Sequence, residues 1–260
     1  MQPKNHVDTT KPTEVTHLSL CTGYGGIDLG LARVVSNLRT VAYCEREAAA
    51  IELLLSRMEG GQLDAAPIWT DLRTFPWPAF SGRVDILSGG YPCQPFSAAG
   101  KRLGADDERH LWPAIAAGIR ILRPRVCFFE NVEGHISLGL REVIAELEGL
   151  GYRTTWGIFS AAEVGAPHQR KRVFILAYHQ SIGIQRMRPT WKQESQLSSQ
   201  QVLFRCSGTG EDWRDGTTES VLVRMADGGS DWVDRMRLLG NGVVPATAAR
   251  AFETLMKELL

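Results

Sequence analysis

The sequence predicts a doubly wound α/β fold, with a mostly parallel, twisted sheet and helices on both of its faces. A length of 260 residues and a hydrophobic content of 43% suit one full α/β domain, alone or with a small appendage. Short apolar runs that suit strands alternate with amphipathic segments that suit helices. Several of these runs end on glycine or on a charged residue, and ligands of open α/β sheets bind at such strand ends.

Composition bounds the class of protein. The five cysteines stand at 21, 44, 93, 127 and 206 without C-x-x-C spacing, so neither a disulfide framework nor a zinc site is indicated and no metal is expected. Nothing resembles a signal peptide or a membrane span, and residues 1–14 are expected to form a flexible tail. A cytoplasmic protein that binds no membrane is therefore predicted. The net charge of zero argues against indiscriminate nucleic-acid binding, so such contacts would come from local clusters.

A glycine turn follows the first predicted strand, Val15–Leu20. The stretch C-T-G-Y-G-G-I-D-L-G-L at 21–31 resembles the start of a nucleotide-binding βαβ unit. Gly23, Gly25 and Gly26 permit a tight turn and a close approach of the backbone to a ligand. The G-x-G-G spacing departs from G-x-G-x-x-G, which weakens a dinucleotide interpretation and leaves an ordinary turn as the alternative.

Acidic residues end the next two predicted strands. The strand Thr40–Cys44 ends on Glu45, about 20 residues after the glycines, where a carboxylate can accept from ribose hydroxyls. The alternative is a carboxylate at the N-terminus of a helix over Glu47–Met58. The apolar stretch Ile68–Thr70 leads to Asp71, which points to the same crevice or serves only as a turn residue.

A cysteine loop follows the fourth predicted strand, Val84–Leu87. Residues 89–102 read G-G-Y-P-C-Q-P-F-S-A-A-G-K-R, with Cys93 placed between Pro92 and Pro95. The prolines prevent a strand or an immediate helix, so an irregular loop is predicted. Polar and basic neighbours favour a reactive thiol. The alternative is a cysteine that packs as a small buried hydrophobe.

A buried carboxyl group is predicted at the fifth strand, Val126–Phe129, which follows a helix over Leu111–Leu122. The strand ends on E-N-V at 130–132. Glu130, enclosed by aromatic residues, could keep its proton near neutral pH. A salt bridge at the strand end is the alternative.

An arginine pair precedes the seventh predicted strand. After a helix over Ser137–Leu150 and a strand over Tyr152–Phe159, residues 165–176 read G-A-P-H-Q-R-K-R-V-F-I-L. Within a strand, Arg170 and Arg172 would face the same side and suit a phosphate or a base carbonyl. A basic edge strand is the competing explanation.

The last third of the chain changes composition. Residues 179–234 are rich in Gln, Ser, Gly, Thr and Trp without a long apolar period, so a small irregular region is predicted after a domain at 15–178. Residues 235–260 would return to that domain through a helix over Ala246–Leu260. Its apolar face would pack on the first βα unit and comprises Ala249, Phe252, Leu255, Met256 and Leu259.

Together these motifs resemble the DNA (cytosine-5) methyltransferases of bacterial or phage type, from about Leu18 to Phe252. The motifs that match, in order, are the glycine turn at 23–26, Glu45, Asp71, P-C-Q-P-F-S at 92–97, E-N-V at 130–132, R-x-R at 170–172 and G-N-G-V-V-P at 240–245. The resemblance implies an S-adenosylmethionine-methyltransferase fold with a small target-recognition region at 179–234. It also implies transfer of a methyl group to C5 of a cytosine flipped out of a double-stranded DNA site, through a covalent Cys93 adduct at C6.

Site residues follow from the resemblance by position. The implied catalytic set is Cys93, Glu130, Arg170 and Arg172. The implied S-adenosylmethionine site comprises Gly23, Tyr24, Gly25, Gly26, Glu45, Arg46, Asp71, Leu72, Gly90, Pro92, Leu111, Asn241 and Val243. The implied DNA contacts are Gln94, Ser97, Lys101 and Arg102. The chain departs from the family pattern at Cys21, where an aromatic is common, and at His168, where glutamine is usual.

Three other functions remain open from the sequence. The same fold could act on a tRNA cytosine, as a branch of this family does. A catalytically silent DNA-binding relative is a second alternative, which the presence of Cys93, Glu130 and Arg172 disfavours. The third is a nicotinamide oxidoreductase, suggested only by the βαβ start. The expected partner is double-stranded DNA, and the expected oligomeric state is a monomer.

Overall fold

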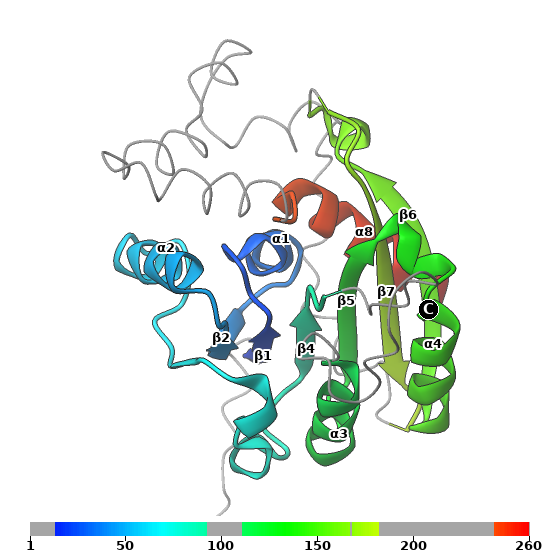
Figure 1. Ribbon diagram of the computed structural model, residues 1–260, viewed down its shortest axis with the longest axis horizontal. Helices are drawn as coiled ribbons and strands as arrows, with labels where there is room; N and C mark the ends of the chain where they lie inside the picture. The colour runs from blue at the N-terminus through cyan, green and yellow to red at the C-terminus, as the bar shows by residue number, and fades with distance from the viewer. Residues whose placement is uncertain (1–13, 93–110, 167, 182–241, 260) are drawn as a thin grey trace, which may run out of the picture.

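The computed structural model describes residues 14–92, 111–166, 168–181 and 242–259. In these residues the strands are β1 Val15–Leu20, β2 Leu38–Cys44, β3 Ile68–Trp69, β4 Ile86–Gly89, β5 Val126–Val132, β6 Tyr152–Ser160 and β7 Lys171–His179. The α-helices are α1 Gly26–Val34, α2 Ala48–Glu59, α3 Trp112–Leu122, α4 Leu140–Gly149 and α8 Pro245–Leu259. Figure 1 shows their arrangement.

Within the described residues, seven strands form one sheet in the order β3-β2-β1-β4-β5-β7-β6. Strands β1 to β5 pair in parallel, whereas β7 runs antiparallel to both β5 and β6. The chain turns from one half of the sheet to the other between β1 and β4, which lie side by side. Such a switch point opens a crevice at the carboxyl ends of the strands.

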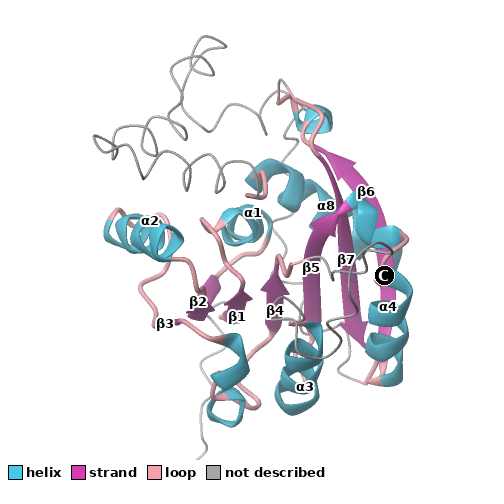
Figure 2. Cartoon of the chain, viewed as in Figure 1, coloured by secondary structure: helices cyan, strands magenta, loops and turns pink. Residues whose placement is uncertain are grey.

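Helices cover both faces of this sheet, as predicted (Figure 2). On one face α1 and α8 pack together in a core with Phe128 from β5 and Phe174 from β7. On the other face α3 and α4 bury their apolar stripes against Cys127, Phe129 and Ile175. The expected doubly wound, mostly parallel sheet is confirmed, as is the return of the C-terminal helix to the first βα unit.

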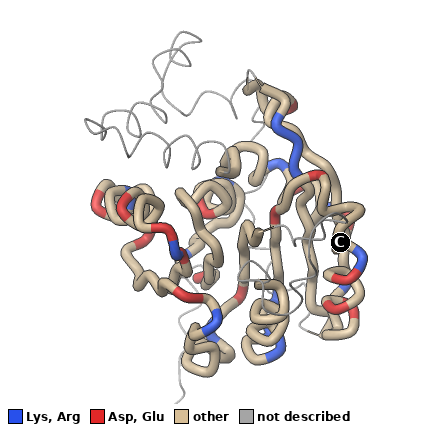
Figure 3. The backbone as a smooth tube through the Cα atoms, in the orientation of Figure 1, with Lys and Arg blue, Asp and Glu red and all other residues tan. Residues whose placement is uncertain are grey.

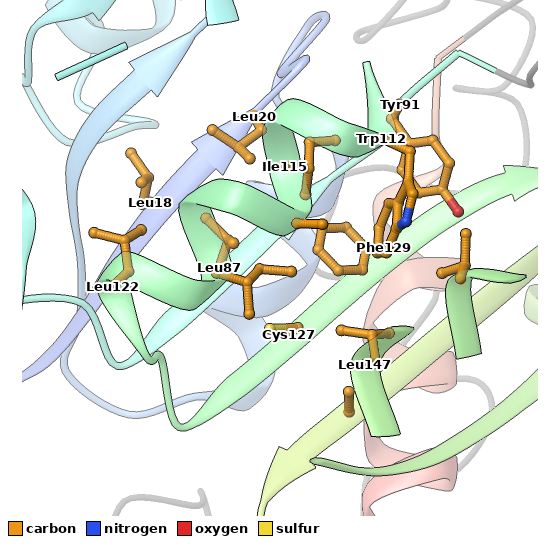
Figure 4. Packing of buried hydrophobic residues seen from close by; sticks show 14 of the residues in the cluster. Leu18, Leu20, Leu87, Tyr91, Trp112, Ile115, Leu122, Cys127, Phe129 and Leu147 are labelled. Carbon is orange, nitrogen blue, oxygen red and sulfur yellow. The ribbon is translucent and has the colours of Figure 1, made fainter. Parts of the chain in front are cut away.

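Aromatic rings gather near the carboxyl ends of β4 and β5, on the face of the sheet that α3 covers (Figure 4). The ring of Tyr91 lies 5.3 Å from Trp112 and 5.8 Å from Phe129, centroid to centroid. Trp112 meets Phe129 edge to face at 5.6 Å. Because all three rings are buried, the chain that leaves β4 starts from a closely packed wall.

Several predicted boundaries are wrong by two or three residues. Strand β4 begins at Ile86, because Asp85 accepts hydrogen bonds from the backbone N–H and the hydroxyl of Thr16 instead of extending the apolar run. Strand β5 continues through Glu130 to Val132, and α4 begins only at Leu140.

The structure also corrects the argument for the arginine pair. Strand β7 begins at Lys171, so Arg170 precedes it and does not alternate with Arg172 within a strand.

Among the described residues, no helix is both long and apolar enough to span a membrane.

Candidate functional site

A cavity of about 660 Å³ opens where the carboxyl ends of β1, β2, β4 and β5 meet. Its lining includes acidic and basic side chains, among them Glu45, Asp71, Glu130 and Arg172. Figure 3 shows acidic and basic positions side by side where β2 passes into α2. The cavity therefore combines a concave shape with convergent polar groups, as small-molecule sites commonly do.

The glycine turn forms one wall of this cavity. Gly23 and Gly25 have φ angles of 56° and 81°, in the left-handed region that favours glycine. Between them, the Tyr24 side chain lines the cavity and its hydroxyl donates a hydrogen bond to the carbonyl of Val243. The Arg57 guanidinium lies 5.1 Å from the centroid of the Tyr24 ring. Tyr24 thus joins the turn to the segment that leads into α8.

Glu45 organises the end of β2. Its side chain is 8% exposed and accepts hydrogen bonds from the backbone N–H of Gly23 at 2.6 Å, of Arg46 at 2.7 Å and of Glu47 at 2.9 Å. A carboxylate offers about four acceptor positions, so room for a further donor remains. Both interpretations of Glu45 are therefore compatible, because one carboxylate can hold the backbone and still face the cavity.

Asp71 lies just after β3, the strand that pairs with β2. It caps the 3₁₀ helix Leu72–Thr74, because its Oδ1 accepts from the backbone N–H of Arg73 at 3.0 Å. The turn role proposed for this residue is confirmed, and the exposed carboxylate also lines the cavity.

A buried ion pair joins β5 to β7. Arg172 Nε lies 2.8 Å from Glu130 Oε1, and the side chain of Glu130 is 8% exposed. Burial raises the pKa of Glu130 to about 7, although Arg172 and Arg170 act to lower it. The salt bridge and the raised pKa therefore occur together. With a pKa of about 7, the carboxyl group of Glu130 changes its protonation state near neutral pH. Arg170 is half-buried, and burial and Arg172 lower its pKa.

The chain that leaves β4 is tied to the segment after Glu130. Asn131 Nδ2 donates to the carbonyl of Tyr91 at 3.1 Å, and the Tyr91 hydroxyl shares a hydrogen bond with His135 Nε2 at 2.9 Å. Pro92, the next residue, lines the cavity. The base of the predicted cysteine loop is therefore fixed at the rim of the site.

Most predicted cofactor residues lie at this cavity. Those that line it are Gly23, Tyr24, Glu45, Arg46, Asp71, Leu72, Gly90, Pro92 and Leu111. Gly25, Gly26 and Val243 are buried and do not line it. Of the predicted catalytic residues, Glu130 and Arg172 line the cavity and Arg170 does not. Cys93, Gln94, Ser97, Lys101, Arg102 and Asn241 lie outside the described residues.

Sequence reasoning missed several lining residues. They are Cys21, Cys44, Glu47, Ala50, Thr70, Arg73, Tyr91, Asn131, Val132 and Gly242. All except Ala50 stand within two residues of a predicted position, so applying the predictions to whole segments would have found them.

The described cysteines do not suit a nucleophile. Burial, reinforced by Glu45, raises the pKa of Cys21 far above its ordinary value. Burial raises the pKa of Cys44 to about 12 and that of Cys127 further. These thiols stay protonated at neutral pH, which makes them poor nucleophiles.

Comparison with known proteins identifies the family. A family model described as C-5 cytosine-specific DNA methylase matches residues 15–237. Type II methyltransferase M.NgoMIV of Neisseria gonorrhoeae is 34% identical over 169 residues, which cover 63% of this chain and 52% of that protein. Type II methyltransferase M.AplI of Arthrospira platensis is 31% identical over 169 residues, which cover 64% and 46%. The chain thus spans about half the length of these relatives.

Solved structures share the fold. A mutant form of DNMT2 from Spodoptera frugiperda has a TM-score of 0.56 at 20% identity, covering 65% of this chain and 51% of that chain. A putative DNA modification methyltransferase encoded within an E. coli prophage has a TM-score of 0.51 at 23% identity, covering 65% and 47%. The sheet is therefore that of an α/β methyltransferase. Because the family model covers most of its length, the chain belongs to the C-5 cytosine-specific DNA methylase family.

Proposed function

We propose that this chain transfers a methyl group from S-adenosylmethionine to C5 of a cytosine in double-stranded DNA. The observation that carries the proposal is the Glu130–Arg172 pair, a buried carboxyl group with a pKa of about 7 beside a guanidinium. The pair lines the cavity that Glu45 and Asp71 also line. Membership of the C-5 cytosine-specific DNA methylase family supports the same reaction.

The cavity fits the cofactor that this reaction needs. Its volume of about 660 Å³ lies within the usual range for small-molecule sites. Glu45 would accept from the ribose hydroxyls, and Asp71 would accept from a donor on the base. Gly90 and Glu130 both line the cavity, and a Cβ at Gly90 would stand 3.2 Å from Glu130 Oε2, so a side chain at this position would crowd the carboxyl group. When bound, the cofactor supplies an electrophilic methyl sulfonium.

The residues of the chain would then activate the cytosine. Cys93, which follows Pro92 in the sequence, would add as a thiolate to C6 and shift electron density onto C5. Glu130, holding its proton, would donate a hydrogen bond to N3 and offset the charge that builds up in the ring. Arg172 would donate to O2 in the same way. Removal of one such contact typically costs about 3 kcal/mol or more in the transition state.

The covalent step must then be reversed. After the methyl group is on C5, loss of the C5 proton to a base, for which water suffices, expels the Cys93 thiolate and restores the aromatic ring.

Because C5 and C6 are inaccessible inside a duplex, the cytosine has to be flipped into the cavity. We assign contacts with the surrounding strand to Gln94, Ser97, Lys101 and Arg102, as the resemblance implies. We also propose that the protein acts as a monomer in the cytoplasm.

A trapping experiment tests this function. Duplex DNA that carries 5-fluorocytosine at the target should form a covalent adduct with the protein in the presence of the cofactor, because fluorine cannot leave C5 as a proton does. Cys93→Ser should form none. Methyl transfer into duplex DNA and into tRNA is measured in parallel, and bisulfite mapping locates the target. Transfer into tRNA alone, or an adduct that persists in the serine variant, contradicts the proposal.

A further inference from the structure

Tyr91 and His135 form a buried pair that no motif predicts. The Tyr91 hydroxyl and His135 Nε2 are 2.9 Å apart, and the rings meet edge to face with centroids separated by 5.6 Å. Tyr91 is 2% exposed and His135 is 0% exposed. Burial lowers the pKa of His135, so the imidazole is neutral and can accept from the tyrosine hydroxyl.

The pair connects two segments that carry separate parts of the proposed reaction. Tyr91 stands two residues before Cys93, at the point where the chain leaves β4. His135 lies in the 3₁₀ helix Glu133–Ile136, directly after the strand that holds Glu130. Tyr91 is therefore held twice by the segment after Glu130, at its carbonyl by Asn131 and at its hydroxyl by His135.

This double attachment restrains the direction of the chain. The hydrogen bond from Asn131 fixes only the carbonyl of Tyr91 and leaves the orientation of the tyrosine side chain unrestrained. With the ring also packed on Trp112 and bonded to His135, both ends of the residue are fixed relative to β5. Attacking atoms must lie within a narrow range of distance and angle, and an error of about 1 Å can cost about a hundredfold in rate.

We propose that the Tyr91–His135 hydrogen bond is a positioning device, which fixes the base of the segment that carries Cys93 relative to the Glu130–Arg172 pair. The inference rests on the proposed function, because it assigns Cys93 and Glu130 to one reaction. Neither Tyr91 nor His135 touches the reacting atoms in this scheme. Their effect passes through the peptide that leads from Tyr91 through Pro92 to Cys93.

The chain offers a matched control. Tyr152 is also 2% exposed, and its hydroxyl donates to the carbonyl of Pro124 at 2.7 Å at the opposite end of the sheet. The Tyr152 hydroxyl also forms a hydrogen bond with Cys127. Tyr91→Phe and Tyr152→Phe therefore both remove buried hydrogen bonds of a tyrosine hydroxyl and keep the ring, and both should lower the thermal midpoint.

The decisive measurement is the single-turnover rate of covalent capture of duplex DNA that carries 5-fluorocytosine. Tyr91→Phe should slow capture at least about tenfold, whereas Tyr152→Phe should stay within about twofold of wild type. The dissociation constant for S-adenosylhomocysteine should change less than about twofold in both. His135→Leu should slow capture as much as Tyr91→Phe does. His135→Gln should recover part of the rate, because glutamine restores a hydrogen-bonding partner. The double variant Tyr91→Phe/His135→Leu should capture DNA no more slowly than either single variant.

A second readout separates failure of this inference from failure of the proposed function. The rate at which a neutral alkylating reagent modifies Cys93, followed by mass spectrometry, reports on the loop without DNA. Tyr91→Phe should change this rate and Tyr152→Phe should not. Capture or alkylation at the wild-type rate in Tyr91→Phe, or an equal change in Tyr152→Phe, overturns the positioning role. Absence of capture by wild type overturns the proposed function, while the alkylation rates still decide the positioning role.

Discussion

The carboxylate of Glu45 both accepts hydrogen bonds from the backbone and lines the cavity, and experiments can separate these two roles. It accepts from the backbone N–H of Gly23, which holds the glycine turn against the end of β2, and from two N–H groups of the chain that follows it. Its remaining acceptor capacity faces the cavity. Glu45→Ala should weaken binding of S-adenosylhomocysteine by about 1 to 3 kcal/mol, the range of hydrogen bonds to charged groups. Isothermal titration calorimetry measures the loss.

A modified ligand isolates the ribose contact from the loss of backbone support. With an analogue that lacks both ribose hydroxyls, wild type and Glu45→Ala should bind with similar affinity, because the contact to the hydroxyls is absent in both. An equal loss with both ligands would mean that Glu45 only supports the turn.

Glu130 should make stability depend on pH. Burial raises its pKa from 4.5 to about 7, so the folded protein binds the proton more tightly than the unfolded chain. Protonation therefore favours the folded state, and this contribution is lost as the pH rises from 4.5 to about 7. The unfolding free energy of wild type should fall relative to Glu130→Gln across this window, by an amount on the order of 3 kcal/mol.

Asp28 makes the comparison with Glu130→Gln necessary. Burial raises the pKa of Asp28 to about 6, so it shifts stability in the same direction and in an overlapping pH range. Both proteins contain Asp28, and the difference between their urea unfolding curves at each pH cancels its contribution. A difference that stays constant from pH 4.5 to 7 would show that folding does not raise the pKa of Glu130.

At the scale of elements, the glycine turn and the segment before α8 close the cavity together. A Cβ on Gly242 would overlap the ring of Tyr24, and a Cβ on Gly26 would overlap the carbonyl of Val243. Gly242→Ala should therefore lower both the thermal midpoint and the affinity for S-adenosylhomocysteine. Removing the ring in Gly242→Ala/Tyr24→Ala should recover part of the loss, with a coupling energy of about 0.5 to 3 kcal/mol.

Gly149→Ala is the matched control for this substitution. A Cβ at Gly149 meets nothing within 4 Å, and the residue lies at the end of α4 away from the cavity lining. It should leave both measurements near wild type. Additive losses from Gly242→Ala and Tyr24→Ala would contradict a shared wall.

The elements also show what the sequence could predict. Local apolar runs located the strands, and the rule that ligands bind at their carboxyl ends placed Glu45, Asp71 and Glu130 at one cavity, whereas Arg172 was predicted from the arginine pair before the last strand. The end of β5 was missed because Glu130 interrupts the apolar run, although the strand continues through it and Arg172 pairs with its carboxyl group.

Contacts between distant segments were beyond the reach of local patterns. The Tyr91–His135 hydrogen bond joins residues 44 positions apart, and the Tyr24–Val243 hydrogen bond joins residues 219 positions apart. In the sequence, Tyr91 is one more aromatic residue before a proline. Its hydrogen bond to His135 depends on how the 3₁₀ helix Glu133–Ile136 packs against Tyr91, which tertiary packing determines.

At the scale of the whole molecule, the described lining of the cavity comes from parts of the chain on either side of residues 182–241. The described chain leaves the sheet after β7, which ends at His179, and resumes at Gly242 against Tyr24. Helix α8 then packs on α1, β6 and β7. Because the catalytic groups and phosphate contacts carry no sequence information, specificity must come from groups that reach base edges in a groove.

We therefore expect the segment from 179 to 234 to select the DNA target. It holds side chains of the types that read purines through paired hydrogen bonds, namely Gln185, Arg186, Arg188, Lys192, Gln193, Arg205 and Arg214. Replacing the segment with that of a relative of different specificity should transfer the donor's target, as bisulfite sequencing would detect. The affinity for S-adenosylhomocysteine should stay unchanged, since the proposed cofactor residues lie outside the replaced segment. An active chimera that still methylates the original site would place recognition elsewhere in the chain.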